Sequence, residues 1–264
     1  MRIDLTSKRA VVSGSTSGIG FAIVSGLAEC GADVVINGRS EASVSDAVQR
    51  LKSRLPKANI DGVAADLGTS DGVARLTGRI GAADILVNNV GIFEPKAFAE
   101  IPDQDWFRFF EVNVMSGVRL SRHYLPGMIE RNWGRVVFIS SESALQIPPE
   151  MIHYGMTKTA QLAVSRGLAE TAAGTGVTVN SVLPGPTRSD GVVAFFEKMA
   201  KEHGVSQAEM ERDFITQHRP TSLLRRLATV EEVANMVVYV CSPQASATTG
   251  AALRVDGGVV RSII

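Results

Sequence analysis

Seven short apolar runs, separated by segments with helical periodicity, constrain the fold more than any other feature of this sequence. The runs are rich in β-branched residues and continuous, which is typical of parallel strands covered on both faces. They are residues 10–13, 34–37, 62–65, 85–88, 136–140, 177–183 and 251–255. Apolar residues recur about every 3.6 positions in residues 19–30, 42–55, 72–80, 103–130, 154–173 and 230–241. We therefore expect an α/β fold, a doubly wound parallel sheet of about seven strands with helices on both faces.

One segment, residues 189–226, departs from this alternation. It is helical in pattern, but no strand follows it promptly. Pro and Gly clusters lie at predicted strand ends and do not divide the chain, so we expect residues 1–264 to form a single domain. Insertions after the carboxyl end of a strand tend to cover a ligand site. Residues 189–226 are therefore predicted to form a lid over the substrate.

Charge and cysteine content narrow the classes of function. The chain has 27 basic and 27 acidic residues, and a neutral chain lacks the field that attracts nucleic acid or an anionic membrane. Its charged start predicts no signal peptide, and no apolar run approaches the ~18 residues of a membrane span. The two cysteines are too few for a disulfide framework, and no His, Cys and Asp set has metal-ligand spacing. We expect a cytoplasmic protein with no metal, nucleic acid or membrane partner.

A glycine-rich segment directly follows the first predicted strand and opens the first predicted helix. Gly14 permits a sharp turn, Gly18 lets a phosphate approach the backbone, and Gly20 lets the helix pack close to the strand. Free N–H groups at the helix N-terminus then favour a bound pyrophosphate. The pattern predicts a Rossmann-type dinucleotide site formed by Gly14, Ser15, Thr16, Ser17, Gly18, Ile19 and Gly20.

The end of the second predicted strand bears on the identity of the dinucleotide. An acidic residue there would bind the ribose 2′-hydroxyl of NAD, but this strand ends in Asn37, Gly38 and Arg39. Asp33 lies at the opposite end of the strand, and Glu41 is already in the next helix. Arg39 can hold a 2′-phosphate by a charge-assisted hydrogen bond, although a solvated Arg is the alternative. NADP(H) is therefore preferred, with NAD(H) as the second choice.

Four polar residues further along the chain form a candidate catalytic set. Tyr154 and Lys158 are four residues apart and share one face of a predicted helix. Ser141 follows the fifth predicted strand, and Asn113 lies in a long predicted helix. Taken singly, each of these features is more often structural than catalytic.

Together, in this order and spacing, the motifs resemble the short-chain dehydrogenase/reductase family over essentially the whole chain. The glycine loop matches the family's cofactor motif, and residues 88–91 match its Asn-Asn-Ala-Gly turn with Val90 in place of Ala. Tyr154 and Lys158 match its Tyr-x-x-x-Lys pair, and Ser141 its catalytic serine. The resemblance implies a 3-oxoacyl-reductase-like enzyme that acts on CH–OH donors with NAD(P) as acceptor.

The chemistry of such a reaction suggests a role for each member of the set. Tyr154 is expected to be the general acid for carbonyl reduction and the general base for alcohol oxidation. Lys158 is expected to favour the phenolate, and the resemblance implies that it also holds the nicotinamide ribose. Ser141 would stabilise the developing oxyanion, and Asn113 would position a water that links Lys158 to solvent.

The resemblance also implies further cofactor contacts. Asp66 and Leu67 would border the adenine, although Asp66 could equally cap the helix that begins near Ser70. The other expected cofactor contacts are Arg39, Asn88, Gly91, Tyr154, Lys158, Pro184, Gly185 and Thr187, with Ser189 as an alternative to Thr187.

The substrate side is less defined by the sequence. The loop 142–153 and the insertion 192–221 are expected to wall a moderately apolar pocket for a small carbonyl compound or alcohol. The candidate substrate contacts are Glu142, Leu145, His153, Arg188, Phe195 and Phe196. A 3-oxoacyl compound, a polyol and a hydroxy acid are all left open, the last two including an NAD-dependent dehydrogenase of the same family. A non-catalytic dinucleotide sensor is a further alternative, but such proteins usually lose the Tyr or the Lys.

The two long predicted helices, residues 103–130 and 154–173, carry apolar residues on more than one face. A helix that is apolar on two faces packs against something besides its own sheet. In the family these helices pair two subunits, so the resemblance implies a homodimer or a homotetramer.

Overall fold

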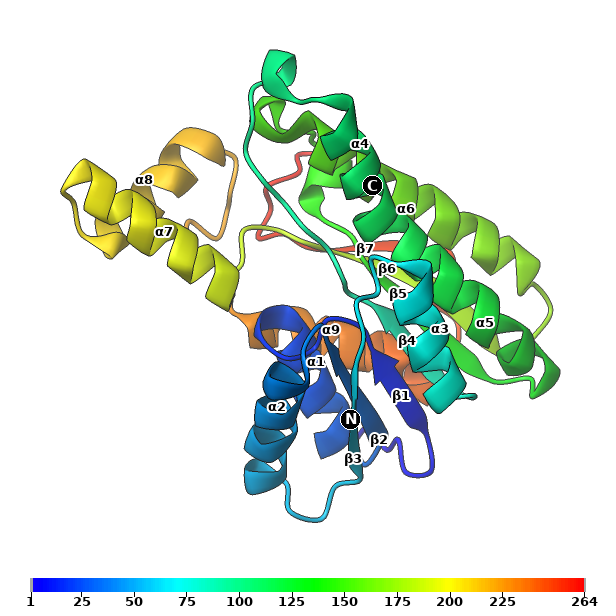
Figure 1. Cartoon of the computed structure of the whole chain (residues 1–264). Coiled ribbons are helices and arrows are strands. Elements are labelled where there is room, and N and C mark those ends of the chain that lie inside the picture. Colours follow the sequence, from blue (N-terminus) through cyan, green and yellow to red (C-terminus); the bar gives the residue numbers. More distant parts are fainter. Residues whose placement is uncertain (1, 264) are drawn as a thin grey trace.

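A computed structural model describes residues 2–263 of the chain. Its centre is a seven-stranded sheet in the order β3-β2-β1-β4-β5-β6-β7, with every neighbouring pair parallel (Figure 1). The strands are β1 (Arg9–Val12), β2 (Asp33–Gly38), β3 (Ile60–Ala64), β4 (Ile85–Asn88), β5 (Gly134–Ile139), β6 (Val177–Pro184) and β7 (Ala252–Val255). The predicted doubly wound α/β fold is confirmed.

Helices cover both faces of this sheet, because successive side chains of a strand point to opposite faces. In β1, Ala10 and Val12 pack with one group of helices, and Val11 packs with the other. The first group is α1 (Gly18–Glu29), α2 (Glu41–Arg54) and α9 (Val230–Cys241); the second is α3 (Ser70–Arg79), α5 (Ser116–Glu130) and α6 (Ile152–Thr171). Both faces of the sheet are therefore covered, which explains why the strands are continuous apolar runs in the sequence.

The segment predicted as one long helix, residues 103–130, contains a change of helical winding. The helix α4 (Asp103–Phe110) runs into a π-helical turn at Glu111–Met115, and α5 follows directly. A π turn widens the helix by one residue and is frequent at functional sites. Here it contains Asn113.

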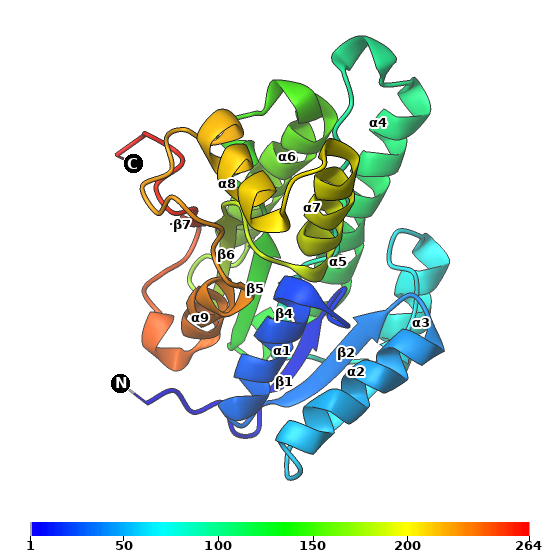
Figure 2. The same ribbon diagram turned by 90° about the vertical axis from the view of Figure 1, so that its left-hand side faces the viewer.

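The predicted insertion folds into two helices, α7 (Asp190–His203) and α8 (Gln207–His218), which lie beyond the carboxyl ends of the strands (Figure 2). Gly204, in the left-handed conformation, ends α7, and a capping box between Ser206 and Glu209 begins α8. The two helices have a small apolar cluster of their own around Phe196 and Ile215. We refer to residues 189–226 as the lid segment.

The order of the strands places a crevice between β1 and β4. The chain proceeds from β1 toward β2 and β3 on one side, and from β4 toward β5, β6 and β7 on the other. Ligands of open α/β sheets bind at such a switch point, outside the carboxyl ends of the strands. No helix within residues 2–263 is long and apolar enough to cross a membrane.

Candidate active site

The glycine loop between β1 and α1 is shaped by close contacts of the backbone. Gly14 and Gly18 have φ angles of 61° and 55°, in the left-handed region that L side chains rarely adopt. A Cβ at Gly20 would lie 2.4 Å from the carbonyl oxygen of Gly14 and 2.6 Å from Asn89 Nδ2. Each glycine therefore performs a geometric task that another residue could not.

Two asparagines from the neighbouring strands hold this loop in place. Asn37, in β2, accepts a hydrogen bond from the Gly14 amide at 3.0 Å. Asn89, just after β4, donates to the carbonyl oxygens of Ser13 and Gly14, both at 2.9 Å. From the sequence, both asparagines were expected at strand ends, but no role in holding the loop was predicted for them. Their position could have indicated this role, because β2 and β4 lie on either side of β1 in the sheet.

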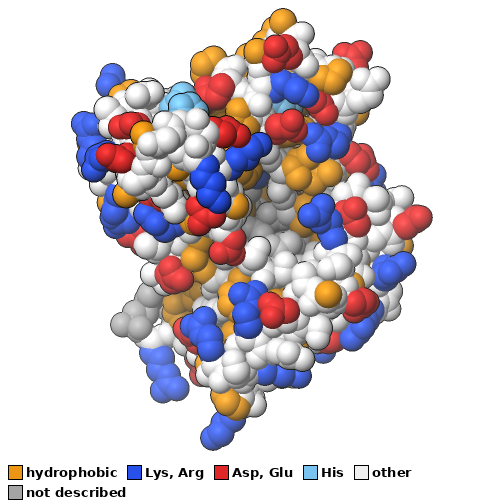
Figure 3. Space-filling view, turned by 60° about the vertical axis from the view of Figure 1, so that its left-hand side comes forward, with side chains coloured by type: hydrophobic (Ala, Val, Ile, Leu, Met, Phe, Trp, Pro, Cys, Tyr) orange, Lys and Arg blue, Asp and Glu red, His pale blue; other side chains and the backbone are white. Residues whose placement is uncertain are grey.

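The loop surrounds a hollow of about 180 Å³, which is lined by residues 17–20, Asn89 and residues 189–191. Figure 3 shows the surface hollowed between lobes on this side of the molecule, with a largely uncharged floor. Asp190, the first residue of α7, accepts a hydrogen bond from the Gly18 amide at 2.9 Å. The N-terminal end of α1 therefore already takes an anionic group, and the residues present fit the pyrophosphate of a dinucleotide.

The other predicted cofactor contacts lie around the same edge of the sheet. Arg39 is exposed just after β2, Asp66 is exposed after β3, and the Leu67 side chain is buried. Thr69, rather than Asp66, caps α3, because its side chain accepts from the Gly72 amide. The alternative reading of Asp66 as the cap is wrong.

Further predicted cofactor contacts lie on two sides of the crevice. Asn88 Nδ2 donates to the Ser121 hydroxyl at 3.2 Å, while its Oδ1 is buried and has no protein partner among the described residues. On the opposite side, β6 ends at Pro184, and the Thr187 hydroxyl donates to the Gly185 carbonyl at 2.9 Å. Buried polar atoms are usually paired, so Asn88 Oδ1 is an acceptor that lacks a donor among the described residues.

Lys158 and Tyr154 share one face of α6, as the spacing predicted. Lys158 is 4% exposed, and its Nζ donates to the Ile139 carbonyl at 2.9 Å and lies 5.5 Å from the Tyr154 ring centre. Burial lowers the pKa of Lys158 to about 8, because it penalises the charged form. A Cβ at Gly91 would lie 3.3 Å from Lys158 Nζ, so the turn after β4 passes directly beside the amine.

The environment of Tyr154 opposes ionisation in this structure. Burial raises the pKa of its phenol, the Ser141 hydroxyl lowers it, Glu142 raises it and Arg219 lowers it. Burial dominates, so the pKa lies above its usual value. The expected lowering of this pKa by Lys158 and by the charge of the nicotinamide stays a prediction for the enzyme with cofactor bound.

Ser141 lies at the end of β5 with both functions of its hydroxyl engaged. Its Oγ accepts from the Ser143 amide at 3.1 Å and donates to Glu142 Oε2 at 2.5 Å. Ser141 and Glu142 are 5% and 4% exposed. The carboxylate therefore holds the serine proton that the proposed oxyanion stabilisation requires.

Asn113 is the most constrained member of the predicted set. Its Oδ1 accepts from the Ile92 amide at 2.8 Å, and its Nδ2 donates to the Ile92 carbonyl and the Thr157 hydroxyl, both at 3.0 Å. Its own carbonyl accepts from Gln161 at 2.6 Å. Asn113 thus ties the turn after β4 to α6, and its predicted link to a water stays a prediction.

The predicted substrate contacts are not brought together as one group. His153 is fully buried beside Trp106 and Phe109, and Phe196 is 1% exposed within the lid cluster. Arg188 forms an ion pair with Glu211. These contacts direct the three side chains toward packing and pairing within the protein.

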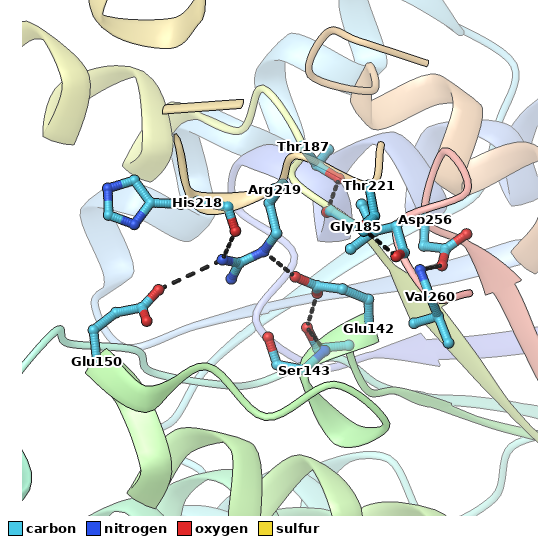
Figure 4. A network of polar contacts seen from close by, with 12 residues as sticks. Glu142, Ser143, Glu150, Gly185, Thr187, His218, Arg219, Thr221, Asp256 and Val260 are labelled. Carbon is cyan, nitrogen blue, oxygen red and sulfur yellow. Dashed lines mark hydrogen bonds and ion pairs between the residues drawn. The ribbon is translucent and has the colours of Figure 1, made fainter. Parts of the chain in front are cut away.

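Glu142, by contrast, belongs to a charged cluster beside Ser141. Arg219, just after α8, lies between two carboxylates: its Nε is 2.9 Å from Glu142 Oε1, and its Nη1 is 3.5 Å from Glu150 Oε1 (Figure 4). Arg219 is 6% exposed. Arg219 was not among the residues predicted from the sequence, because nothing in its local pattern indicates a partner 77 residues away.

Comparison with known proteins finds relatives that match the chain over essentially its whole length. A family model described as enoyl-(acyl carrier protein) reductase matches residues 14–260. The uncharacterised oxidoreductase YvaG of Bacillus subtilis is 51% identical over 263 residues that span all of both chains. D-beta-hydroxybutyrate dehydrogenase of Rhizobium meliloti is 32% identical over 96% of this chain and 98% of that protein. The structure of L-sorbose reductase from Gluconobacter frateurii, complexed with NADPH and L-sorbose, covers all of both chains with a TM-score of 0.93 and 32% identity.

The chain belongs to the short-chain dehydrogenase/reductase family. It is an NAD(P)-dependent oxidoreductase that acts on CH–OH groups. The resemblance inferred from the motifs is confirmed. The pairing of two copies stays a prediction; Phe107 on α4, which is 73% exposed, is available for such a contact.

Proposed function

We propose that this protein is an NADP(H)-preferring carbonyl reductase and alcohol dehydrogenase with Tyr154 as its acid and base. The observation that carries the proposal is the convergence of Tyr154, Lys158 and Ser141 beside the crevice that the glycine loop opens onto. The helix α6 supplies Tyr154 and Lys158, and the segment after β5 supplies Ser141. Hydride transfer coupled to proton transfer requires such a set of groups.

The residues of the chain divide the work of the reaction. When bound, the nicotinamide would supply or accept the hydride. Tyr154 gives its proton to the carbonyl oxygen of the substrate during reduction. During oxidation, it takes the proton of the substrate hydroxyl. Ser141 donates a hydrogen bond to the same oxygen as negative charge develops, and Lys158 stabilises the phenolate that Tyr154 becomes. Gly14, Gly18 and Gly20 would hold the pyrophosphate, and the lid segment, residues 189–226, would exclude water.

The end of β2 supports a preference for NADP(H). Arg39 is exposed there, and the strand ends in Asn37 and Gly38, so no carboxylate at its end repels a 2′-phosphate. Asp33 is paired in register with Arg9, at the far end of the strand. The related L-sorbose reductase is complexed with NADPH.

Replacement of Tyr154 by Phe tests the proposed chemistry. We expect kcat to fall by roughly 10²- to 10⁴-fold, because the general acid is lost while the ring remains. The Kd for NADPH, measured by fluorescence titration, should change by no more than a few-fold. Retained turnover would remove Tyr154 from its role, and NADPH binding without turnover of any ketone or alcohol by the wild type would favour a dinucleotide sensor.

Two relatives suggest different substrates for the same site. One is named for a hydroxy acid, D-beta-hydroxybutyrate, and the other is a reductase of the polyhydroxy ketone L-sorbose. The two classes differ in charge and in the hydroxyl groups beside the reacting carbon. The side chains around Ser141 favour one of them.

A further inference from the structure

We infer that the buried pair of Glu142 and Arg219 selects a neutral carbonyl substrate with a hydroxyl group on the carbon next to the carbonyl. The corresponding product is a vicinal diol, so the substrate class is that of α-hydroxyketones and polyols. The inference rests on the proposed function, since it concerns the substrate of the same site.

The first support is the distance between Glu142 and the catalytic serine. Glu142 Oε2 is 2.5 Å from Ser141 Oγ. A carbonyl oxygen held by the serine would lie about 2.7 Å from the same Oγ. The carboxylate therefore stands within reach of a substituent one carbon away from the carbonyl, and a hydroxyl there could donate to it.

The second support is the way in which the serine proton is used. Ser141 donates to Glu142, and its Oγ accepts from the Ser143 amide. To stabilise an oxyanion, Ser141 must give up its bond to Glu142, which leaves a buried carboxylate short of one donor. A substrate hydroxyl that donates to Glu142 replaces the serine in that bond. The Ser141 proton is then free for the carbonyl oxygen.

The third support is the charge of the cluster. Glu142 and Glu150 carry two formal negative charges against the single positive charge of Arg219. The Glu142 and Arg219 side chains are 6% and 8% exposed, so water screens them weakly. Their charges reach Tyr154, whose pKa is set first by burial, then lowered by Ser141, raised by Glu142 and lowered by Arg219. A substrate carboxylate at this carbon would lie directly against the Glu142 carboxylate oxygen that faces Ser141, which disfavours hydroxy and keto acids.

Arg219 also links the selection to the lid segment. It follows the last residue of α8, and its guanidinium lies 5.7 Å from the ring centre of Phe214 in that helix. Its Nε donates to Glu142 Oε1, and the other carboxylate oxygen, Oε2, accepts from the Ser141 hydroxyl. The lid segment thereby orients the Glu142 carboxylate, which would accept the substrate hydroxyl.

Three ketones of equal carbon number test the inference on the wild type. Hydroxyacetone, acetone and pyruvate differ in one terminal group: a hydroxymethyl, a methyl and a carboxylate. With NADPH and with NADH, we expect kcat/KM for hydroxyacetone to exceed that for the other two by roughly 10- to 100-fold, the size of a hydrogen bond to a charged group. The larger share of the difference from acetone should appear in kcat, because Ser141 is released only by the hydroxyl.

Glu142→Gln tests the residue itself. The substitution keeps the shape but weakens the acceptor and removes one negative charge. Both preferences for hydroxyacetone, over acetone and over pyruvate, should fall at least fivefold. Glu202→Gln is the matched control, an exposed glutamate of α7 for which we expect unchanged ratios. Thermal unfolding and the Kd for NADPH establish that each variant is folded.

The outcomes separate the inference from the proposed function. Turnover of acetone or pyruvate as efficiently as hydroxyacetone by the wild type overturns the inference alone, and this result does not depend on any variant folding. Unchanged ratios in folded Glu142→Gln overturn it as well. If the wild type turns over no compound in a wider panel of ketones, aldehydes and alcohols, the proposed function itself fails.

Discussion

The glycine loop and the lid segment face each other across one crevice, yet they are built in different ways. The loop is held by backbone contacts and by two asparagines from adjacent strands of the sheet. The lid has a small apolar cluster of its own, and single side chains join it to the rest of the site: Asp190 contacts the glycine loop, and Arg219 contacts Glu142 beside Ser141. The glycine loop is a short, closely packed motif that two neighbouring asparagines support. The lid segment depends instead on charged side chains whose partners are far away in the chain.

This difference bears on what each half of the site can recognise. Backbone amides at a helix N-terminus bind phosphate in the same way whatever the neighbouring side chains are. A charged pair such as Glu142 and Arg219 depends on both partners, and a change at either one alters the ligand it accepts. The loop geometry therefore suits a pyrophosphate whatever the substrate is, whereas the charged pair bears on which substrate is accepted.

A methyl group added on each side of the crevice should show the contrast most strongly. In Gly20→Ala the Cβ would lie 2.4 Å from the Gly14 carbonyl oxygen, and we expect NADPH binding to weaken by at least about 100-fold. In Gly191→Ala, on the lid side of the same hollow, no described atom lies within 4 Å of the new Cβ. Calorimetric titration should show near-normal affinity for that variant. Equal affinities would contradict the packing argument.

Lys158 lies on α6, between the two regions. Burial of its positive charge should lower the free energy of unfolding of the protein. Below about pH 8 the amine is charged both folded and unfolded, and burial lowers the free energy of unfolding by up to about 3 kcal/mol. From pH 8 to 10.5 the unfolded chain holds more protons, so this cost disappears as pH rises. We expect Lys158→Met to be more stable than the wild type at pH 7, with the difference shrinking toward pH 10.5.

Urea denaturation at a series of pH values measures this difference. Lys198→Met is the control, because Lys198 lies exposed on α7 and carries no burial cost. A stability difference for Lys158→Met that is constant with pH would show that the lysine is not buried in its charged form.

Arg39→Ala should separate the two cofactors. We expect the Kd for NADPH to rise roughly 10- to 100-fold, the size of a charge-assisted hydrogen bond, while that for NADH changes little. Arg54→Ala is matched to it, since Arg54 lies at the other end of α2 and pairs with Glu29. An equal loss for both cofactors would remove Arg39 from 2′-phosphate recognition.

Asp190→Asn should give the smallest effect and the opposite sign. Asp190 occupies the Gly18 amide, so its carboxylate competes with a pyrophosphate and repels it. We expect NADPH to bind roughly three- to tenfold more tightly to the variant. The same change at Asp213, exposed on α8, should leave the Kd unaltered. Weaker binding by Asp190→Asn would mean that the lid carboxylate assists the cofactor instead.

Much of the fold could be predicted from the sequence, because buried parallel strands and the helices between them have strong hydrophobic patterns. The expected strand at residues 85–88 matches β4, and the expected first helix differs from α1 by one residue at each end. The π turn at Glu111–Met115 was not predicted, because its helical periodicity differs little from that of an α-helix. The two helices of the lid were expected only as one helical segment, since the left-handed Gly204 between them is a single residue.

The sequence by itself determined the individual strands, the glycine loop and the pair of Tyr154 and Lys158, because each depends on residues close together in the chain. Only the tertiary structure decided that Asn37 and Asn89 hold the loop, that Asp190 contacts Gly18, and that Arg219 meets Glu142. These contacts join residues 23 to 172 positions apart. The physical reason is that hydrogen bonds and ion pairs act over a few ångströms in space, so distant partners leave no local pattern.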